Sequence, residues 1–131
     1  MAPPDHPEAT PRPRRRPHRV YDVGQNPEPR DSLANERTFL AWVRTSLALV
    51  AGAVAVSSPA LEFPLTARLL LSLGLVLVAA VALGVGWHRW TRTEVAMRTG
   101  GPPPGFTGGM VVLGAVGLLM AGALAATLIG H

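Results

Sequence analysis

The chain contains no cysteine and no lysine, and only eight of its 131 residues are acidic. The absence of cysteine excludes a disulfide framework, a thiolate zinc or iron–sulfur site and a cysteine nucleophile. Without lysine, all twelve basic residues are arginines, and the formal net charge is +4. A chain of this length has room for one folded domain at most.

Polar and apolar residues are separated along the chain. Residues 1–30 hold eight of the 13 prolines and six of the twelve arginines, three of them consecutive at Arg14, Arg15 and Arg16. This composition predicts a disordered Pro/Arg-rich tail that cannot build a core. No apolar stretch follows the basic run closely enough to form a secretory signal. Residues 31–131 are therefore expected to form the folded domain.

Three long apolar runs follow the tail. They cover residues 39–56, 65–87 and 110–129, and they contain one, one and no charged residues. About 20 residues of α-helix cross a hydrocarbon core of about 30 Å. We therefore predict an all-α integral membrane bundle of three transmembrane helices, at about residues 32–56, 65–88 and 110–130. A soluble fold with three buried helices is the alternative, but no amphipathic segment is present to cover them.

The arginines are distributed unequally between the two sides that this layout creates. By alternation, one side receives the six tail arginines together with Arg37, Arg89, Arg92 and Arg98. Arg68 borders the opposite side. The positive-inside rule then predicts a plasma-membrane protein with a cytoplasmic N-terminus and an outside C-terminus at His131. Trp87 and Trp90 are expected to flank the cytoplasmic end of the second span, as interfacial aromatic residues do.

The first span carries the most informative segment, RDSLANERTFLAWVRTSLAL at residues 30–49. Asp31 or Ser32 can cap the helix, with Asn35 and Glu36 in its first turn. At 100° per residue, two arginines share a sector of about 100° with small residues. Its members are Arg37, Ala41, Arg44, Ala48, Ala51, Gly52 and Ala55. Because small faces mark helix contacts in membranes, both arginines are expected to point into the protein rather than towards lipid.

Three interpretations of Arg44 remain open. Its guanidinium can extend to the headgroups, with Arg37 as an ordinary flanking base. It can instead pair with an acid, Glu36 or Glu94, and lock the helices together. In the third, the arginines form a basic vestibule for an anion, extended by Arg68, Arg89 and Arg92.

The other two spans also have small faces. The second span carries Arg68, Ser72, Ala79, Ala82 and Gly86, and the third carries Gly114, Gly117, Ala121 and Ala125. Such faces predict close packing, within one chain or between chains. Three helices alone enclose no pore, so a conduit requires a homo-oligomer or a membrane partner.

The segment in the first span resembles the signature of the YidH-like family of small bacterial inner-membrane proteins, a domain of unknown function. The matching positions are Asp31, Leu33, Ala34, Asn35, Glu36, Arg37, Thr38, Phe39, Leu40, Ala41, Trp42, Arg44, Thr45 and Leu47. The resemblance covers about residues 30–130 and implies the same three-span layout. It implies no settled activity.

The same domain is similar to the membrane part of the eukaryotic vacuolar transporter chaperone. There it accompanies a polyphosphate polymerase, and its basic intramembrane residues are associated with polyphosphate passage. The resemblance implies Glu36, Arg37 and Arg44 as the matching residues. This sequence holds no polymerase or regulatory domain, so polyphosphate synthesis is not implied.

Enzymatic residues and cofactor sites are not evident. None of the four histidines has metal-ligand spacing: His6, His18, His88 and His131. Glu62 and Glu94 are expected on opposite sides of the membrane, so they cannot act as a carboxylate pair. The glycine-rich linker 100–109 lacks the lysine of a P-loop. We therefore expect neither an enzyme nor a bound cofactor or metal.

Two functions follow from these features. One is a homo-oligomeric anion or polyphosphate-type conduit, or a subunit of one, and the other is a non-conducting membrane scaffold or accessory subunit. In both, the expected partner is the lipid bilayer, which the basic tail contacts in preference to nucleic acid.

Overall fold

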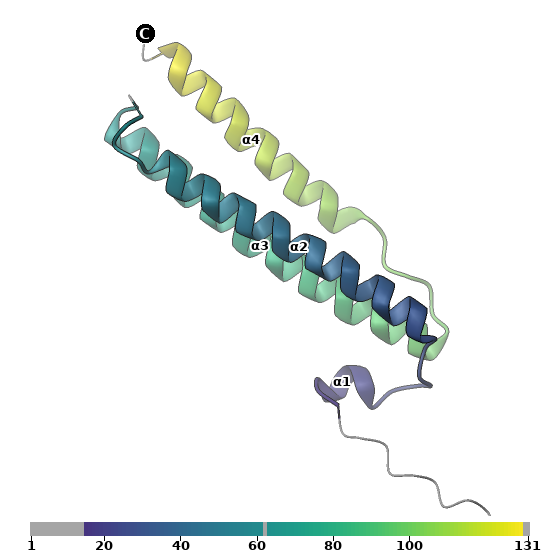
Figure 1. Cartoon of the computed structure of the whole chain (residues 1–131). Helices are drawn as coiled ribbons and strands as arrows, with labels where there is room; N and C mark the ends of the chain where they lie inside the picture. Colours follow the sequence, from purple (N-terminus) through teal and green to yellow (C-terminus); the bar gives the residue numbers. More distant parts are fainter. Residues whose placement is uncertain (1–14, 62, 130–131) are drawn as a thin grey trace, which may run out of the picture.

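The computed structural model describes residues 15–61 and 63–129 (Figure 1). Four helices form: α1 (His18–Tyr21), α2 (Pro29–Val56), α3 (Leu65–Thr99) and α4 (Thr107–Ile129). The described residues contain no strand. The three later helices are long and apolar enough to cross a membrane. The predicted all-α, three-span architecture is therefore confirmed.

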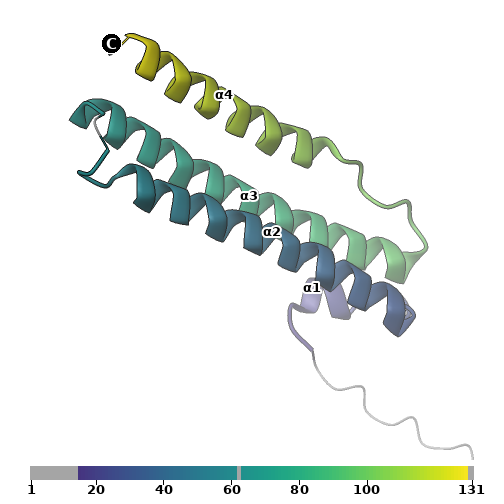
Figure 2. The ribbon, with the colours of Figure 1, turned by 45° about the horizontal axis from the view of Figure 1, so that its top comes forward.

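Helix α3 is the centre of the arrangement. It runs antiparallel to α2 along most of its length, and α4 lies along its other side (Figure 2). In the part of the chain that the structure describes, the backbones of α2 and α4 do not come close to each other. The three long helices thus form an open layer, and one chain encloses no lumen.

Two helix ends differ from the prediction. Helix α2 begins at Pro29, ahead of the expected caps Asp31 and Ser32, because proline at the first helical position needs no hydrogen-bond acceptor. Helix α3 continues to Thr99, eleven residues beyond the expected end at 88. It stops at Gly100, whose φ of 71° gives a left-handed turn that only glycine adopts readily. The helix therefore continues past the end of the apolar run.

The contact between α2 and α3 places large residues against small ones. Trp42 and Leu49 of α2 pack beside Ala82 of α3, in a core that also includes Val78. The predicted small face of the second span is thus confirmed as a packing face, and Gly86 lies directly against Trp42.

Gly86→Ala is expected to lower the free energy of unfolding by about 1–3 kcal/mol through overpacking. A methyl group there would lie 2.6 Å from Cβ of Trp42. Gly84→Ala is the matched control, because no atom lies within 4 Å of its added Cβ. Reversible unfolding in mixed detergent micelles measures both. Equal effects of the two substitutions would contradict this packing.

The expected inward orientation of the arginine-bearing sector of α2 is wrong for the single chain. The buried residues of α2 are Asn35, Ser46 and Ala53, whereas Arg37 and Arg44 are exposed. The side of α2 that carries its buried residues, together with Trp42 and Leu49, lies against α3, so the arginine-bearing side is left outward. The small face of α4 is likewise exposed, at Gly114, Gly117, Ala121 and Ala125.

Part of the expected disordered tail differs from the prediction. In residues 17–28 the chain forms α1 and packs on the C-terminal part of α3 (Figure 1). Val20 is fully buried there. The predictions made for residues 1–14, for Glu62 and for His131 lie outside the described residues.

Candidate functional site

The functional features gather where α1, the start of α2, the end of α3 and the linker 100–106 meet. We call this the basic end of the molecule. An aromatic cluster closes it towards the membrane span: the Trp87 and Trp90 rings stack with centroids 5.3 Å apart, and Phe39 lies 6.0 Å from Trp87. Trp87 is exposed, as expected of an interfacial residue, whereas Trp90 is buried against α2.

A buried carboxylate lies above these rings. Glu94 is 0% exposed. Arg98 Nη2 lies 3.3 Å from Glu94 Oε1, and Ser32 Oγ donates to the same oxygen at 3.2 Å. Asn35 Nδ2 donates to Glu94 Oε2 at 3.2 Å and to the Trp90 carbonyl at 3.1 Å. A buried charge is tolerated when it is paired and hydrogen-bonded, so this network holds α2 and α3 together.

Arg98 extends the network to the N-terminal residues. Its Nη1 donates to Asn26 Oδ1 at 3.2 Å, and its guanidinium lies 4.7 Å from the centre of the Tyr21 ring. Its carbonyl accepts the Gln25 N–H at 3.0 Å. Gly24, with φ of 62°, approaches this carbonyl so closely that a Cβ would lie 2.0 Å away. A single arginine thus fixes residues 21–26 on α3.

The proposed pairing of Arg44 with Glu94 is therefore wrong, because Glu94 pairs with Arg98. Within residues 15–61 and 63–129, Arg44 forms no ion pair with Glu36 either. The extension of α3 explains the difference, since it places Glu94 and Arg98 one helical turn apart. Their spacing of four residues was the sequence signal for this pair. Nothing local indicated that Ser32 and Asn35 would join it from 59–62 residues away.

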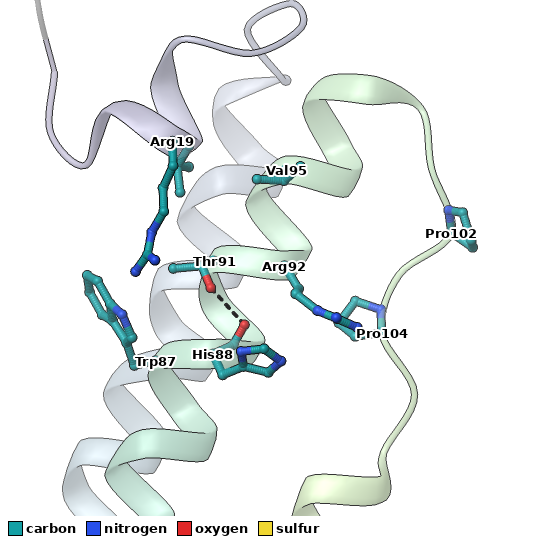
Figure 3. A pocket seen from close by; sticks show the side chains of 9 residues that line it. Arg19, Trp87, His88, Thr91, Arg92, Val95, Pro102 and Pro104 are labelled. Carbon is teal, nitrogen blue, oxygen red and sulfur yellow. Dashed lines mark hydrogen bonds between the residues drawn. The ribbon is translucent and has the colours of Figure 1, made fainter.

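A basic pocket lies between α1, α3 and the linker (Figure 3), with a volume of about 470 Å³. Arg19 reaches it from α1 beside Trp87, while His88 and Arg92 reach it from α3 near Pro104. The remaining walls are Val20, Thr91, Val95 and Pro102. No carboxylate from residues 15–61 or 63–129 lines this pocket, so its charge favours an anion.

The structure brings two of the predicted anion-binding residues together here. Arg92 lines the basic pocket and also a second hollow of about 440 Å³, which Arg89 shares. Arg89 Nη1 donates to the Gly105 carbonyl at 2.8 Å, and its guanidinium lies 5.9 Å from the centre of the Phe106 ring. Arg89 therefore holds the linker, and Arg92 is left facing the hollows.

The other candidates lie elsewhere. Arg37 and Arg44 are exposed on α2, and Arg68 is half-buried near the start of α3, at the opposite end. Of the motif residues, Trp42 packs against Gly86, while three are exposed: Asp31, Glu36 and Thr38. The five predicted arginines therefore do not form one site.

The basic end offers no site for a metal within the part of the chain that is described, since no group of three or more His, Asp or Glu side chains is placed to hold one. Glu94, the buried acid of this region, already has its oxygens occupied by three side-chain donors.

Comparisons with known proteins agree with this architecture. Residues 30–96 match the family model described as "Domain of unknown function (DUF202)". An uncharacterized protein of Mycobacterium tuberculosis, Rv2272, is 42% identical over 109 residues, which cover 77% of this chain and 88% of that protein. The inner membrane protein YidH of Escherichia coli K12 is 43% identical over 81 residues, covering 61% of this chain and 70% of YidH. No solved structure matches. The chain is therefore a membrane protein and belongs to the YidH-like family defined by the DUF202 domain.

Proposed function

We propose that the chain forms a homo-oligomer in the inner membrane in which one face of α2 lines a path for anions. We call this the arginine face: Arg37, Ala41, Arg44, Ala48, Ala51 and Ala55. The observation that supports it is the exposure of all six residues in the single chain. The opposite side of α2, which carries Asn35, Ser46 and Ala53, is occupied by α3, so this face is free to meet a second copy.

The position of Arg44 in the span is the physical reason. It lies seven residues beyond Arg37, about 10 Å deeper at 1.5 Å per residue. An arginine facing lipid costs roughly 2.5–3.5 kcal/mol at the centre of a span, and less nearer the end. Association through the arginine face removes Arg44 from lipid, and the alanines allow the backbones to approach. Between subunits, the guanidinium can meet water and anions.

The orientation of the chain belongs to the same proposal. Among the described arginines, Arg68 borders the opposite end, while most of the others lie at or near the basic end. The positive-inside rule places that end in the cytoplasm. A reporter enzyme that works only outside the cytoplasm is expected to be active when fused after His131 and inactive when fused before Met1. The reverse pattern would contradict this orientation.

Disulfide cross-linking tests the assembly, because the natural chain has no cysteine to interfere. Ala48→Cys is expected to give cross-linked dimers in oxidised membranes, since residue 48 lies on the arginine face. Leu70→Cys, exposed on α3 at 71%, is the matched control and is expected to stay monomeric. Equal cross-linking at both positions would reflect random collision and would reject the arginine face as the interface.

A non-conducting scaffold is the second candidate. The Glu94 network favours it, because it joins α1, α2 and α3 into a fixed unit at the basic end. A scaffold predicts assembly without anion flux, which separates it from the conduit.

A further inference from the structure

The basic pocket lies on α3, away from the arginine face, and it calls for a role of its own. We propose that it binds the phosphate group of an anionic molecule, with Arg19 and Arg92 as the charged ligands. This binding does not depend on whether the arginine face conducts anions.

Uncompensated charge is the first argument. Two arginines and one histidine line the pocket, and none of the acids in the described residues does. Neither Arg19 nor Arg92 forms an ion pair or a hydrogen bond with another described residue. The nearby Glu94 cannot neutralise them, since it is fully buried and already bonded to Arg98, Ser32 and Asn35. An anion entering the pocket therefore meets guanidinium donors to which the described part of the chain offers no ion pair or hydrogen bond.

The donor chemistry favours phosphate. A guanidinium presents paired N–H groups that match two oxygens of a phosphate. Arg19 and Arg92 come from different helices and line the same hollow, Arg19 beside Trp87 and Arg92 towards Pro104 (Figure 3), so an anion that enters it has a guanidinium on either side. The His88 ring adds a further polar group at the wall. The volume of about 470 Å³ lies within the range of sites for small molecules.

The apolar walls suit a phosphate that carries an organic group. Val20, Val95, Pro102 and Pro104 line the pocket beside the arginines. Trp87 stands at its edge, at the end of the apolar run of α3, where aromatic residues mark the headgroup level of a bilayer. A lipid headgroup phosphate and a soluble phosphate compound share this chemistry, and both can reach this depth.

The pocket is also held in shape on two sides. On one side, Arg98 fixes α1 through Tyr21 and Gln25, and this places Arg19 over α3. On the other, Arg89 holds the linker through the Gly105 carbonyl at 2.8 Å. The arginines that bind the phosphate are thus distinct from those that build the walls.

Labelling of a single cysteine tests the proposal. Thr91→Cys places a thiol in the pocket wall, and Thr99→Cys places one at the same end of α3 outside the pocket. The full chain is reconstituted in phosphatidylcholine vesicles, in vesicles with added phosphatidylglycerol, and in phosphatidylcholine vesicles with inorganic phosphate or glycerol phosphate outside. We expect phosphatidylglycerol or a soluble phosphate to slow maleimide labelling at residue 91 about tenfold, with residue 99 affected far less.

The arms of the experiment separate the two sources. Protection by phosphatidylglycerol alone assigns the site to a lipid headgroup, and protection by the soluble compounds assigns it to a free phosphate. No protection by either, or equal slowing at residues 91 and 99, would overturn the proposal.

Charge-matched variants give the second test. Arg19→Gln combined with Arg92→Gln removes both proposed ligands, and all protection at residue 91 is expected to disappear. Arg15→Gln combined with Arg16→Gln removes the same charge from exposed residues outside the pocket, and protection is expected to remain. All four arginines are exposed, so these substitutions are expected to leave the protein folded. Equal loss of protection in both double variants would show that the phosphate compounds are attracted to the basic surface as a whole and do not bind at a site.

Discussion

Arg44→Ala is expected to lower anion flux through the reconstituted oligomer at least about tenfold. In the proposed assembly, the Arg44 guanidinium replaces part of the hydration of a passing anion. A hydrogen bond to a charged group contributes about 1.5–3 kcal/mol, and each 1.4 kcal/mol is a factor of ten. Efflux of chloride and of polyphosphate from vesicles, at equal protein and equal oligomer size, measures the change.

Two further variants locate the effect. Arg37→Ala is expected to reduce flux less, because Arg37 lies closer to the end of the span, where water already solvates an anion. Arg16→Ala removes the same charge from an exposed residue outside the spans, and it is expected to leave flux unchanged. Normal flux in an Arg44→Ala oligomer of native size would rule out Arg44 as a lining residue.

Glu94→Ala is expected to lower the free energy of unfolding by about 3–5 kcal/mol, the usual effect of breaking a buried ion pair. The substitution leaves the buried Arg98 guanidinium without its counter-charge, and it deprives Ser32 and Asn35 of an acceptor. The contact between α2 and α3 is weakened at the basic end, and α1 is loosened with it. Reversible unfolding in mixed detergent micelles provides the measurement.

Glu94→Gln separates charge from hydrogen bonding. The amide oxygen still accepts a hydrogen bond, so the free energy of unfolding is expected to lie between the values of the wild type and of Glu94→Ala. Arg92→Ala, on an exposed residue one half-turn away on the same helix, is expected to change stability by less than about 0.5 kcal/mol. A Glu94→Ala protein as stable as the Arg92→Ala protein would contradict a structural role for the network.

The spans could be predicted from the sequence because length and hydropathy alone determine them. The eleven residues that extend α3 to Thr99 could not be predicted, because they do not continue the apolar run. Gly100 is the sequence signal for the end of the helix. That extension is what brings Glu94 and Arg98 within one turn of each other. If α3 is taken to end at Thr99, the four-residue spacing of Glu94 and Arg98 predicts the ion pair from the sequence.

The faces of α2 illustrate a second limit. A helical wheel correctly groups Arg37 and Arg44 with alanines, but it does not say which face meets the neighbouring helix. The choice depends on the partner: α3 offers Ala82 and Gly86, and Trp42 of α2 packs against them. The arginine-bearing side then remains on the outside of the single chain, together with large residues such as Leu40 and Leu47.

The candidate site was predicted only in part. Arg89 and Arg92 were identified because they follow an apolar run and carry the same charge. Arg19 was missed as a pocket residue because its segment reads as disordered, and its placement depends on contacts with Arg98 about 80 residues later. A tail rich in proline and arginine gives no local sign of such a long-range contact.

The reversal potential of the reconstituted oligomer tests most directly whether Arg44 lines an anion path. Across a potassium chloride gradient, the wild-type protein is expected to reverse near the chloride equilibrium potential. Arg44→Glu places a negative charge at the same depth, and the reversal potential is expected to move towards that of potassium. A wild-type oligomer without conductance, or one whose reversal potential is the same before and after this substitution, would contradict the proposed path.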